Sequence, residues 1–137
     1  MATIVCAIDD SPGAIEALRV AGALSAGFDV RLVLAHVASG WPSPGGASLT
    51  TARALEGGRR LLERAAREHK LEAEQRVEVG EPADALSRIA AEEGATVIVI
   101  GSRRQGRRQP KLRSALAREL AATARCPVVV VPPPPRR

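Results

Sequence analysis

Aromatic side chains are nearly absent from this chain of 137 residues, in which Phe28 and Trp41 are the only two and there is no tyrosine. Such a composition disfavours a β-sandwich, whose sheets are stabilised by aromatic cross-strand pairs. Hydrophobic residues still make up 45% of the chain, so the core must come from Val, Ile, Leu and Ala. We therefore expect a parallel sheet of β-branched residues covered by helices rich in Ala and Leu.

Three further absences limit the class of protein. No stretch approaches the roughly 20 apolar residues that a membrane span needs. The first residues, Met1 to Cys6, contain no basic region and run directly into a strand pattern, so we expect no signal peptide and a cytoplasmic location. Cys6 and Cys126 lie far apart, each beside an apolar run, which favours buried free thiols over a metal-binding pair.

The net charge of +5 is concentrated in one segment. Between Gly101 and Arg113 there is no acidic residue, and the C-terminus adds Arg136 and Arg137. The basic residues of the segment are Arg103, Arg104, Arg107, Arg108, Lys111 and Arg113. Because the charge is local, the segment is a candidate site for anions, whereas the rest of the chain is slightly acidic.

Apolar runs alternate with helical patterns along the chain. Five strands are expected at 3–8, 30–37, 75–79, 95–100 and 126–131. Helices are expected from Ser11 and Pro12 to a stop at Gly27, from Thr50 or Thr51 to about His69, over 83–93 with Gly94 as its stop, and over 114–124. This order predicts an α/β fold, a five-stranded parallel open sheet with helices on both faces. The alternating segment 75–79 predicts a half-exposed strand at a sheet edge.

The second helix has two expected faces. Leu55, Leu61, Leu62 and Ala65 lie on the side that we expect to pack inward. Arg59, Arg60, Glu63, Arg64, Arg67 and Glu68 are expected to be mostly solvated. The pair Gly57 and Gly58 weakens the middle of this helix by roughly 1 kcal/mol per glycine relative to alanine.

Ligands of such sheets bind beyond the carboxyl ends of the strands. The segments at that edge are 9–11, 36–39, 80–82, 101–113 and Pro132. Most of the residues that could bind a ligand lie there, so this edge is the expected site.

Five segments of the chain resemble the universal stress protein family when they are taken in order and spacing. They are Ile4–Pro12, Leu34–Val37, Val79–Pro82, Ala95–Ser102 and Ala124–Val131. The resemblance covers residues 1–132 as one domain and leaves 133–137 as a proline and arginine tail. It implies a Rossmann-like fold of the adenine-nucleotide alpha hydrolase type with strand order 3-2-1-4-5. It also implies a role in stress survival and a homodimer paired through the last strand.

Members of this family that bind ATP carry a glycine, two residues, a second glycine, nine residues and then Gly-Ser or Gly-Thr. Here Gly101 is the first glycine, Arg104 replaces the second, and Ser114 with Ala115 replaces the final pair. A glycine loop lets backbone N–H groups approach a phosphate with no Cβ in the way. The altered motif predicts weak or no binding of ATP, although the surrounding arginines still attract phosphate.

The remaining candidate residues have a structural alternative to a ligand role. Asp9 matches the family position on the adenine side of ATP, and it could instead cap the first helix with Ser11. Ala7, Ile8 and Val37 match positions that flank the adenine, but simple core packing also explains them. His36 and His69 are best explained as structural or solvated side chains. No nucleophile with a base and no metal-ligand cluster is apparent, so no catalytic or metal-binding residue is expected.

Three functions remain open from the sequence. The leading hypothesis is a non-enzymatic cytoplasmic stress-response domain with an altered nucleotide pocket and weak or no ATP binding. The alternative is a genuine ATP- or AMP-binding stress sensor that hydrolyses ATP slowly. Nucleic-acid binding through the basic segment 101–113 is third, because that segment has no aromatic residue for base stacking. No membrane partner is expected.

Overall fold

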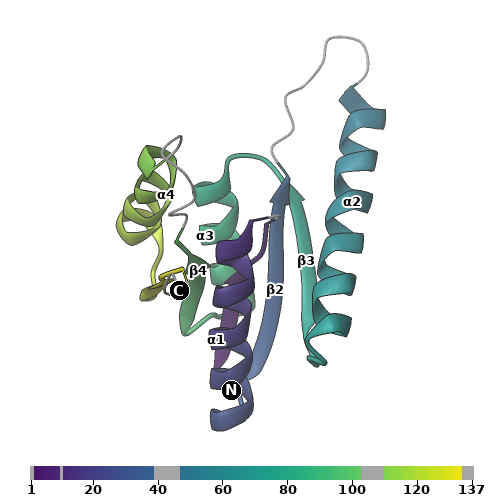
Figure 1. Cartoon of the computed structure of the whole chain (residues 1–137). Coiled ribbons are helices and arrows are strands. Elements are labelled where there is room, and N and C mark those ends of the chain that lie inside the picture. The colour runs from purple at the N-terminus through teal and green to yellow at the C-terminus, as the bar shows by residue number, and fades with distance from the viewer. Residues whose placement is uncertain (1, 10, 39–46, 103–109, 134–137) are drawn as a thin grey trace.

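The computed structural model describes residues 2–9, 11–38, 47–102 and 110–133, and their side chains except at 47–50 and 110–114. Its sheet has five parallel strands in the order β3-β2-β1-β4-β5 (Figure 1). The strands are β1 (Thr3–Ala7), β2 (Arg31–Ala38), β3 (Glu74–Val79), β4 (Val97–Gly101) and β5 (Val128–Val131). The expected strand order is therefore confirmed, with β3 and β5 at the two edges.

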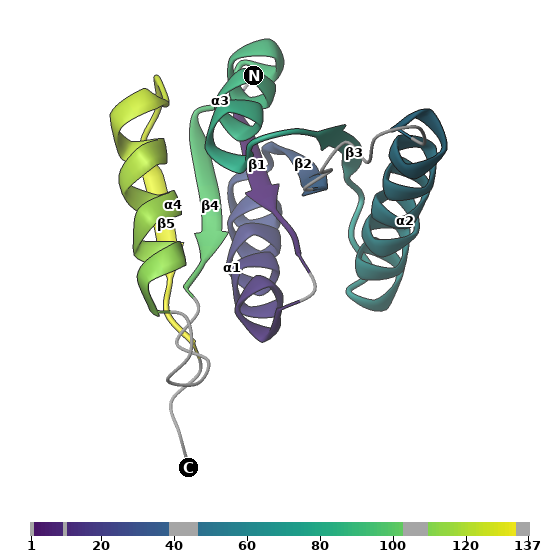
Figure 2. The same ribbon diagram turned by 90° about the horizontal axis from the view of Figure 1, so that it is seen from above.

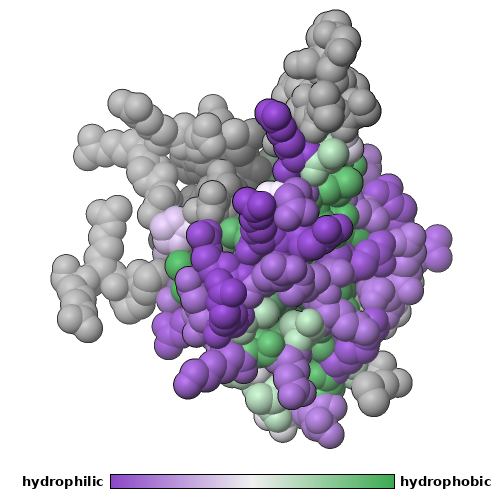
Figure 3. Space-filling model, turned by 90° about the vertical axis from the view of Figure 1, so that its right-hand side faces the viewer, coloured by the Kyte–Doolittle hydropathy of each residue, from purple (hydrophilic) through white to green (hydrophobic). Residues whose placement is uncertain are grey.

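Four helices connect the strands and cover both faces of the sheet (Figure 2). They are α1 (Pro12–Phe28), α2 (Ala47–Glu68), α3 (Pro82–Glu93) and α4 (Pro110–Thr123). Helices α1 and α2 pack on one face, and α3 and α4 pack on the other. The outward side of α2 is mostly hydrophilic (Figure 3).

The sheet has a hydrophobic core on each face, and alternate residues of each central strand point into one core or the other. In β1, Ile4 and Cys6 face α1 and α2, whereas Val5 faces α3 and α4. Cys6 is fully buried and unpaired, and burial raises the pKa of its thiol to about 12. The sequence-based expectation of a buried free thiol is confirmed for Cys6, and Cys126 is a half-buried free thiol.

The ends of the helices differ in part from the expected ones. Ser11 is the N-cap of α1 and Pro12 its first residue, as predicted. The predicted stop at Gly27 is wrong, because α1 runs on to Phe28 and Asp29 takes the left-handed conformation with φ 51°. Aspartate tolerates that conformation better than most residues, so a glycine is not needed there. Gly94, with φ 65°, ends α3 as predicted.

Two of the other helices, α2 and α4, begin earlier than expected. Helix α4 begins at Pro110, not at Ser114, and α2 begins at Ala47, not at Thr50 or Thr51. Proline is favourable at the first position of a helix, since its missing N–H would have no partner there. The turn of helix before Ser114 changes the position of the altered glycine motif relative to the helix terminus.

The edge strand β3 is held by a network of ion pairs. Arg76 of β3 pairs with Glu92 at 2.7 Å, with Glu78 at 2.9 Å and with Glu93 at 3.3 Å. Arg31 of β2 also pairs with Glu93, at 2.5 Å. Hydrogen bonds to Glu92 and to Glu93 raise the pKa of Arg76 and of Arg31, respectively. The network connects β2 and β3 to the end of α3 and surrounds the edge with charge.

Helix α2 approaches the sheet closely at one point, Gly58. A Cβ at this position would lie 2.6 Å from Cγ1 of Val77 and 2.8 Å from Cδ2 of His36. The preceding Gly57 is different, because a Cβ there would meet nothing within 4 Å. Only the second glycine of the pair is therefore required for packing.

We expect Gly58→Ala to lower the free energy of unfolding by about 1–2 kcal/mol, because the overlap with Val77 and His36 outweighs the gain in helix propensity. The matched variant Gly57→Ala should instead raise it, by up to about 1 kcal/mol. Urea denaturation of the two single variants measures both changes. Equal stabilisation by the two substitutions would contradict the close approach at Gly58.

Candidate functional site

A cleft of about 1310 Å³ lies at the carboxyl edge of the sheet. Its walls come from the ends of β1, β2 and β4 and from helices α2, α3 and α4. It is larger than the roughly 300–1,000 Å³ that small-molecule sites usually occupy. This position agrees with the rule that parallel sheets bind ligands beyond the carboxyl ends of their strands.

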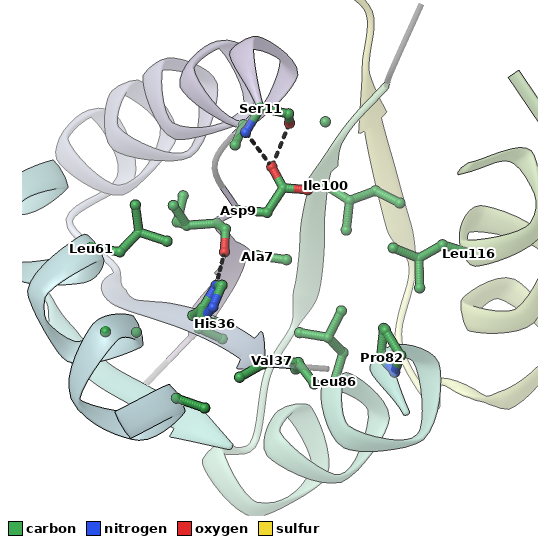
Figure 4. Close-up of a pocket in the computed structure, with 18 of the residues that line it drawn as sticks. Ala7, Asp9, Ser11, His36, Val37, Leu61, Pro82, Leu86, Ile100 and Leu116 are labelled. Carbon is green, nitrogen blue, oxygen red and sulfur yellow. Dashed lines mark hydrogen bonds between the residues drawn. The ribbon is translucent and has the colours of Figure 1, made fainter. Parts of the chain in front are cut away.

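The part of the cleft nearest the sheet is apolar (Figure 4). In Figure 4, Leu116 of α4 and Ile100 of β4 lie across the cleft from Leu61 of α2. The apolar residues next to the sheet are Ala7, Ala35, Val37, Leu86, Ile100 and Leu116. This apolar floor suits an uncharged planar or aliphatic part of a ligand, and none of the six residues just named has an aromatic ring.

Asp9 and Ser11 form a compact turn where β1 leads into α1. The Ser11 backbone N–H donates to Oδ1 of Asp9 at 2.9 Å, and the Ser11 hydroxyl donates to the same oxygen. Ser11 is also the N-cap of α1, with extended backbone angles. Asp9 therefore has a structural role, since its carboxylate fixes this turn at the cleft wall. The expected capping of α1 together with Ser11 is not seen, because Ser11 makes no side-chain cap hydrogen bond.

His36 connects β2 to the segment after β1. Its Nδ1 donates to the carbonyl oxygen of Ile8 at 2.8 Å (Figure 4). Since a carbonyl oxygen only accepts, this bond places a proton on Nδ1. The interpretation of His36 as a structural histidine is confirmed, although its ring also lines the cleft.

Gly101 has a packing role that the sequence analysis missed. A Cβ at Gly101 would lie 2.2 Å from the carbonyl oxygen of Gly13 and 3.0 Å from the backbone nitrogen of Ala14. The end of β4 therefore contacts the first turn of α1 backbone to backbone. Glycine is required here even without a ligand, because the helix leaves no room for a side chain.

Six of the eight residues that the sequence analysis selected line the cleft: Ala7, Ile8, Asp9, Val37, Gly101 and Ala115. Arg104 lies outside the described residues, as does most of the basic segment. Ser114 lies in the second turn of α4, so the expectation that it starts the helix is wrong. The helix N-terminus that was expected beside Ser114 is at Pro110.

The sequence analysis missed a whole wall of the cleft, which α2 provides. Its residues are Ala54, Gly57, Gly58, Arg60, Leu61, Glu63, Arg64 and Arg67. The charged members are exposed, as expected, but they border the cleft. Paired glycines inside a helix were the available signal that this side lies close to other structure. Glu81 and Glu119 also line the cleft, and the Glu81 carboxylate caps α3 by accepting from the N–H of Asp84 at 2.9 Å.

Neither a metal centre nor a membrane span emerges from the described residues. No three His, Cys, Asp or Glu side chains within the described ranges gather to hold a metal ion. None of the helices, over the residues that the structure describes, is long and apolar enough to cross a membrane.

We expect Gly101→Ala to lower the free energy of unfolding by about 3 kcal/mol, in the absence of any ligand, because the methyl group overlaps the backbone of Gly13. Gly27→Ala, in α1, is the matched control, since a Cβ there meets nothing within 4 Å. Thermal and urea denaturation measure both variants. A Gly101→Ala protein as stable as the wild type would contradict the packing role of this glycine.

Known proteins share both the sequence pattern and the fold. A universal stress protein from Burkholderia pseudomallei is 30% identical, with a TM-score of 0.75 over 97% of this chain and 96% of that one. The universal stress protein of Archaeoglobus fulgidus in complex with dAMP is 23% identical, with a TM-score of 0.65 over 96% and 98%. A family protein from Arabidopsis thaliana with AMP bound is 18% identical, with a TM-score of 0.68 over 98% and 93%.

A comparison with curated proteins gave no match. The model of the universal stress protein family, in contrast, matches residues 1–132, which is nearly the whole chain. The strand order, the cleft at the carboxyl edge and this match agree with one another. The chain therefore belongs to the universal stress protein family.

Proposed function

We propose that this protein is a non-enzymatic cytoplasmic stress-response domain whose cleft binds an adenine mononucleotide and binds ATP weakly or not at all. The observation that carries the proposal is the composition of the cleft. The apolar floor includes Ala7 and Val37 and lies beside Ile8 and Asp9; these four positions match the adenine side of the family's nucleotide site. Such a floor accommodates a base and leaves the charged part of the ligand for the rim.

The relatives support a mononucleotide as the ligand. The protein from Archaeoglobus fulgidus has dAMP, and the protein from Arabidopsis thaliana has AMP. Both share the fold over more than nine-tenths of this chain. A ligand of that size also fits within the volume of the cleft.

The altered motif is the reason to expect weak ATP binding. A β- or γ-phosphate would need backbone N–H groups from the glycine loop, and side chains replace glycine at positions 104 and 114. Ser114, moreover, lies one turn inside α4, where its own N–H belongs to the helix. A mononucleotide has neither of these two phosphates, so the loss of the glycines affects its binding less.

The non-enzymatic part of the proposal rests on how Ser11 and His36 are held. The Ser11 hydroxyl donates to Asp9, and His36 Nδ1 donates to the Ile8 carbonyl. Both bonds stabilise the turn and the strand ends. Among the described residues, no histidine is hydrogen-bonded to the Ser11 hydroxyl, so a serine–histidine pair is not formed.

The rival is a true ATP sensor that hydrolyses ATP slowly. The six basic residues between Gly101 and Arg113 favour it, since arginine can replace backbone N–H groups as a phosphate ligand. It differs from the leading proposal in requiring tight binding of the triphosphate.

Titration calorimetry with AMP and ATP, with and without Mg²⁺, separates the two. We expect AMP to bind, and ATP to bind no more tightly than AMP. In the variant Arg104→Gly, Ser114→Gly, Ala115→Ser, ATP should bind at least tenfold more tightly, because the backbone N–H groups become accessible. Absence of any binding of AMP at millimolar concentration would refute the proposal, and tight ATP binding with phosphate release would establish the rival.

We also propose that the protein is a homodimer paired through β5. This strand forms one edge of the sheet, and its Val129 and Val130 are 37% and 45% exposed. An uncovered edge strand of valines tends to pair with another strand. The opposite edge, β3, is surrounded by the ion pairs of Arg76 and is less suited to this.

We expect Val130→Lys to shift the protein from dimer to monomer, because a buried lysine at the pairing edge is unfavourable. Ala52→Lys adds the same charge on the exposed side of α2 and should leave the dimer intact. Sedimentation equilibrium measures both. A wild-type protein that sediments as a monomer would rule out the dimer.

A further inference from the structure

Helix α2 places a row of arginines along the wall of the cleft that it provides. Arg60, Arg64 and Arg67 all line the cleft. Spacings of four and three residues put them on one face of the helix. Arg60 already shares the Glu56 carboxylate with Arg59, each at 3.4 Å. Arg64 and Arg67 are therefore the two members of the row to consider as ligand contacts.

Within the described residues, neither Arg64 nor Arg67 has a carboxylate at ion-pair distance. Glu68 follows Arg64 by four residues and Glu63 precedes Arg67 by four, which is the spacing at which helical ion pairs form. Neither of these pairs is formed, in contrast to those of Arg19, Arg31, Arg76 and Arg88. Both guanidinium groups are thus available to an anion in the cleft.

The location of these two arginines distinguishes them from other unpaired cations. Arg53, Lys70, Arg118 and Arg125 are exposed and have no ion pair in the described part of the chain, but none of them lines the cleft. Arg64 also borders a second groove of about 200 Å³ between α1 and α2. It lies where this groove meets the cleft, beside Ile8 and Leu61, which line both.

Gly57 is an independent indication that the α2 wall has open space for a ligand. It lines the cleft one turn before Arg60 and two turns before Arg64, and a Cβ there would meet no atom within 4 Å. A glycine in the middle of a helix costs about 1 kcal/mol relative to alanine. Packing does not require it, so its effect is to leave the wall flat and open beside the arginines.

Four acidic residues also line the cleft, but among the described residues none of them forms an ion pair with Arg64 or Arg67. Oδ1 of Asp9 accepts two hydrogen bonds from Ser11, and the Glu81 carboxylate accepts from the N–H groups of Ala83 and Asp84. Glu63 and Glu119 are the other two, and neither is in an ion pair with Arg64 or Arg67.

We propose that the α2 wall is the anion-binding side of the cleft, and that Arg64 and Arg67 contact the phosphate of a small phosphorylated ligand. This inference rests on the proposed function and adds to it where the charged group lies, namely on the side of the cleft away from Gly101 and α4. Guanidinium groups bind phosphate through paired N–H donors, so two of them replace a loop that has lost its glycines. The apolar floor receives the uncharged part of the same ligand.

Calorimetry with AMP and adenosine on three proteins tests this. The double variant Arg64→Gln, Arg67→Gln should bind AMP at least tenfold more weakly than the wild type, because charge-assisted hydrogen bonds to the phosphate are lost. Its affinity for adenosine, which has no phosphate, should be unchanged. The control Arg53→Gln, Arg125→Gln removes the same charge outside the cleft and should bind AMP as the wild type does.

Each outcome has one meaning. Unchanged AMP affinity in the Arg64 and Arg67 variant overturns the inference while the proposed function stands. An equal loss in the control variant also overturns it, since the effect would then come from overall charge. Failure of the wild type to bind AMP overturns the proposed function, and with it the inference. All these side chains are exposed, and matching thermal unfolding of the three proteins verifies that each is folded.

Discussion

The close contact between Gly101 and Gly13 is the constraint on which the site depends. It brings the first turn of α1 against the end of β4 with no side chain between the two backbones. The hydrogen bonds from Ser11 to Oδ1 of Asp9 hold the end of β1 close to the start of α1. A chain with almost no aromatic residues can tolerate such an approach, because its core is filled by small aliphatic side chains that need little space between helix and sheet. Gly101 and Ala14, on the two sides of this contact, both line the cleft.

Much of the fold could be predicted because the signals are local. Unbroken apolar runs, the Ser11–Pro12 start and the Gly94 stop each depend on a few neighbouring residues. The six correct cleft residues came from the rule for parallel sheets together with the family resemblance. The α2 wall was not predicted, because periodicity shows which residues share a face and says nothing of what that face borders. The start of α4 was placed late for a similar reason, since a proline inside a basic segment indicates a loop as readily as a helix start.

The pair Gly57 and Gly58 shows how one sequence signal can have two physical meanings. Gly58 is needed because α2 touches Val77 and His36 there, so its lack of a side chain contributes to stability. Gly57 has open space around it, so its lack of a side chain reduces stability and widens the cleft. Helix propensity alone assigns both glycines the same loss of stability relative to alanine. Only the three-dimensional surroundings separate a packing requirement from room that the fold leaves for another molecule.

The two edges of the sheet are unlike each other, and this limits how copies of the chain can associate. An edge of valines can pair with a like edge, whereas the ion pairs around Arg76 oppose strand addition at β3. Pro132 and Pro133 follow β5 directly and have no N–H to extend a ladder. Head-to-tail growth needs two compatible edges on every molecule, so we expect these two unlike edges to oppose the formation of filaments.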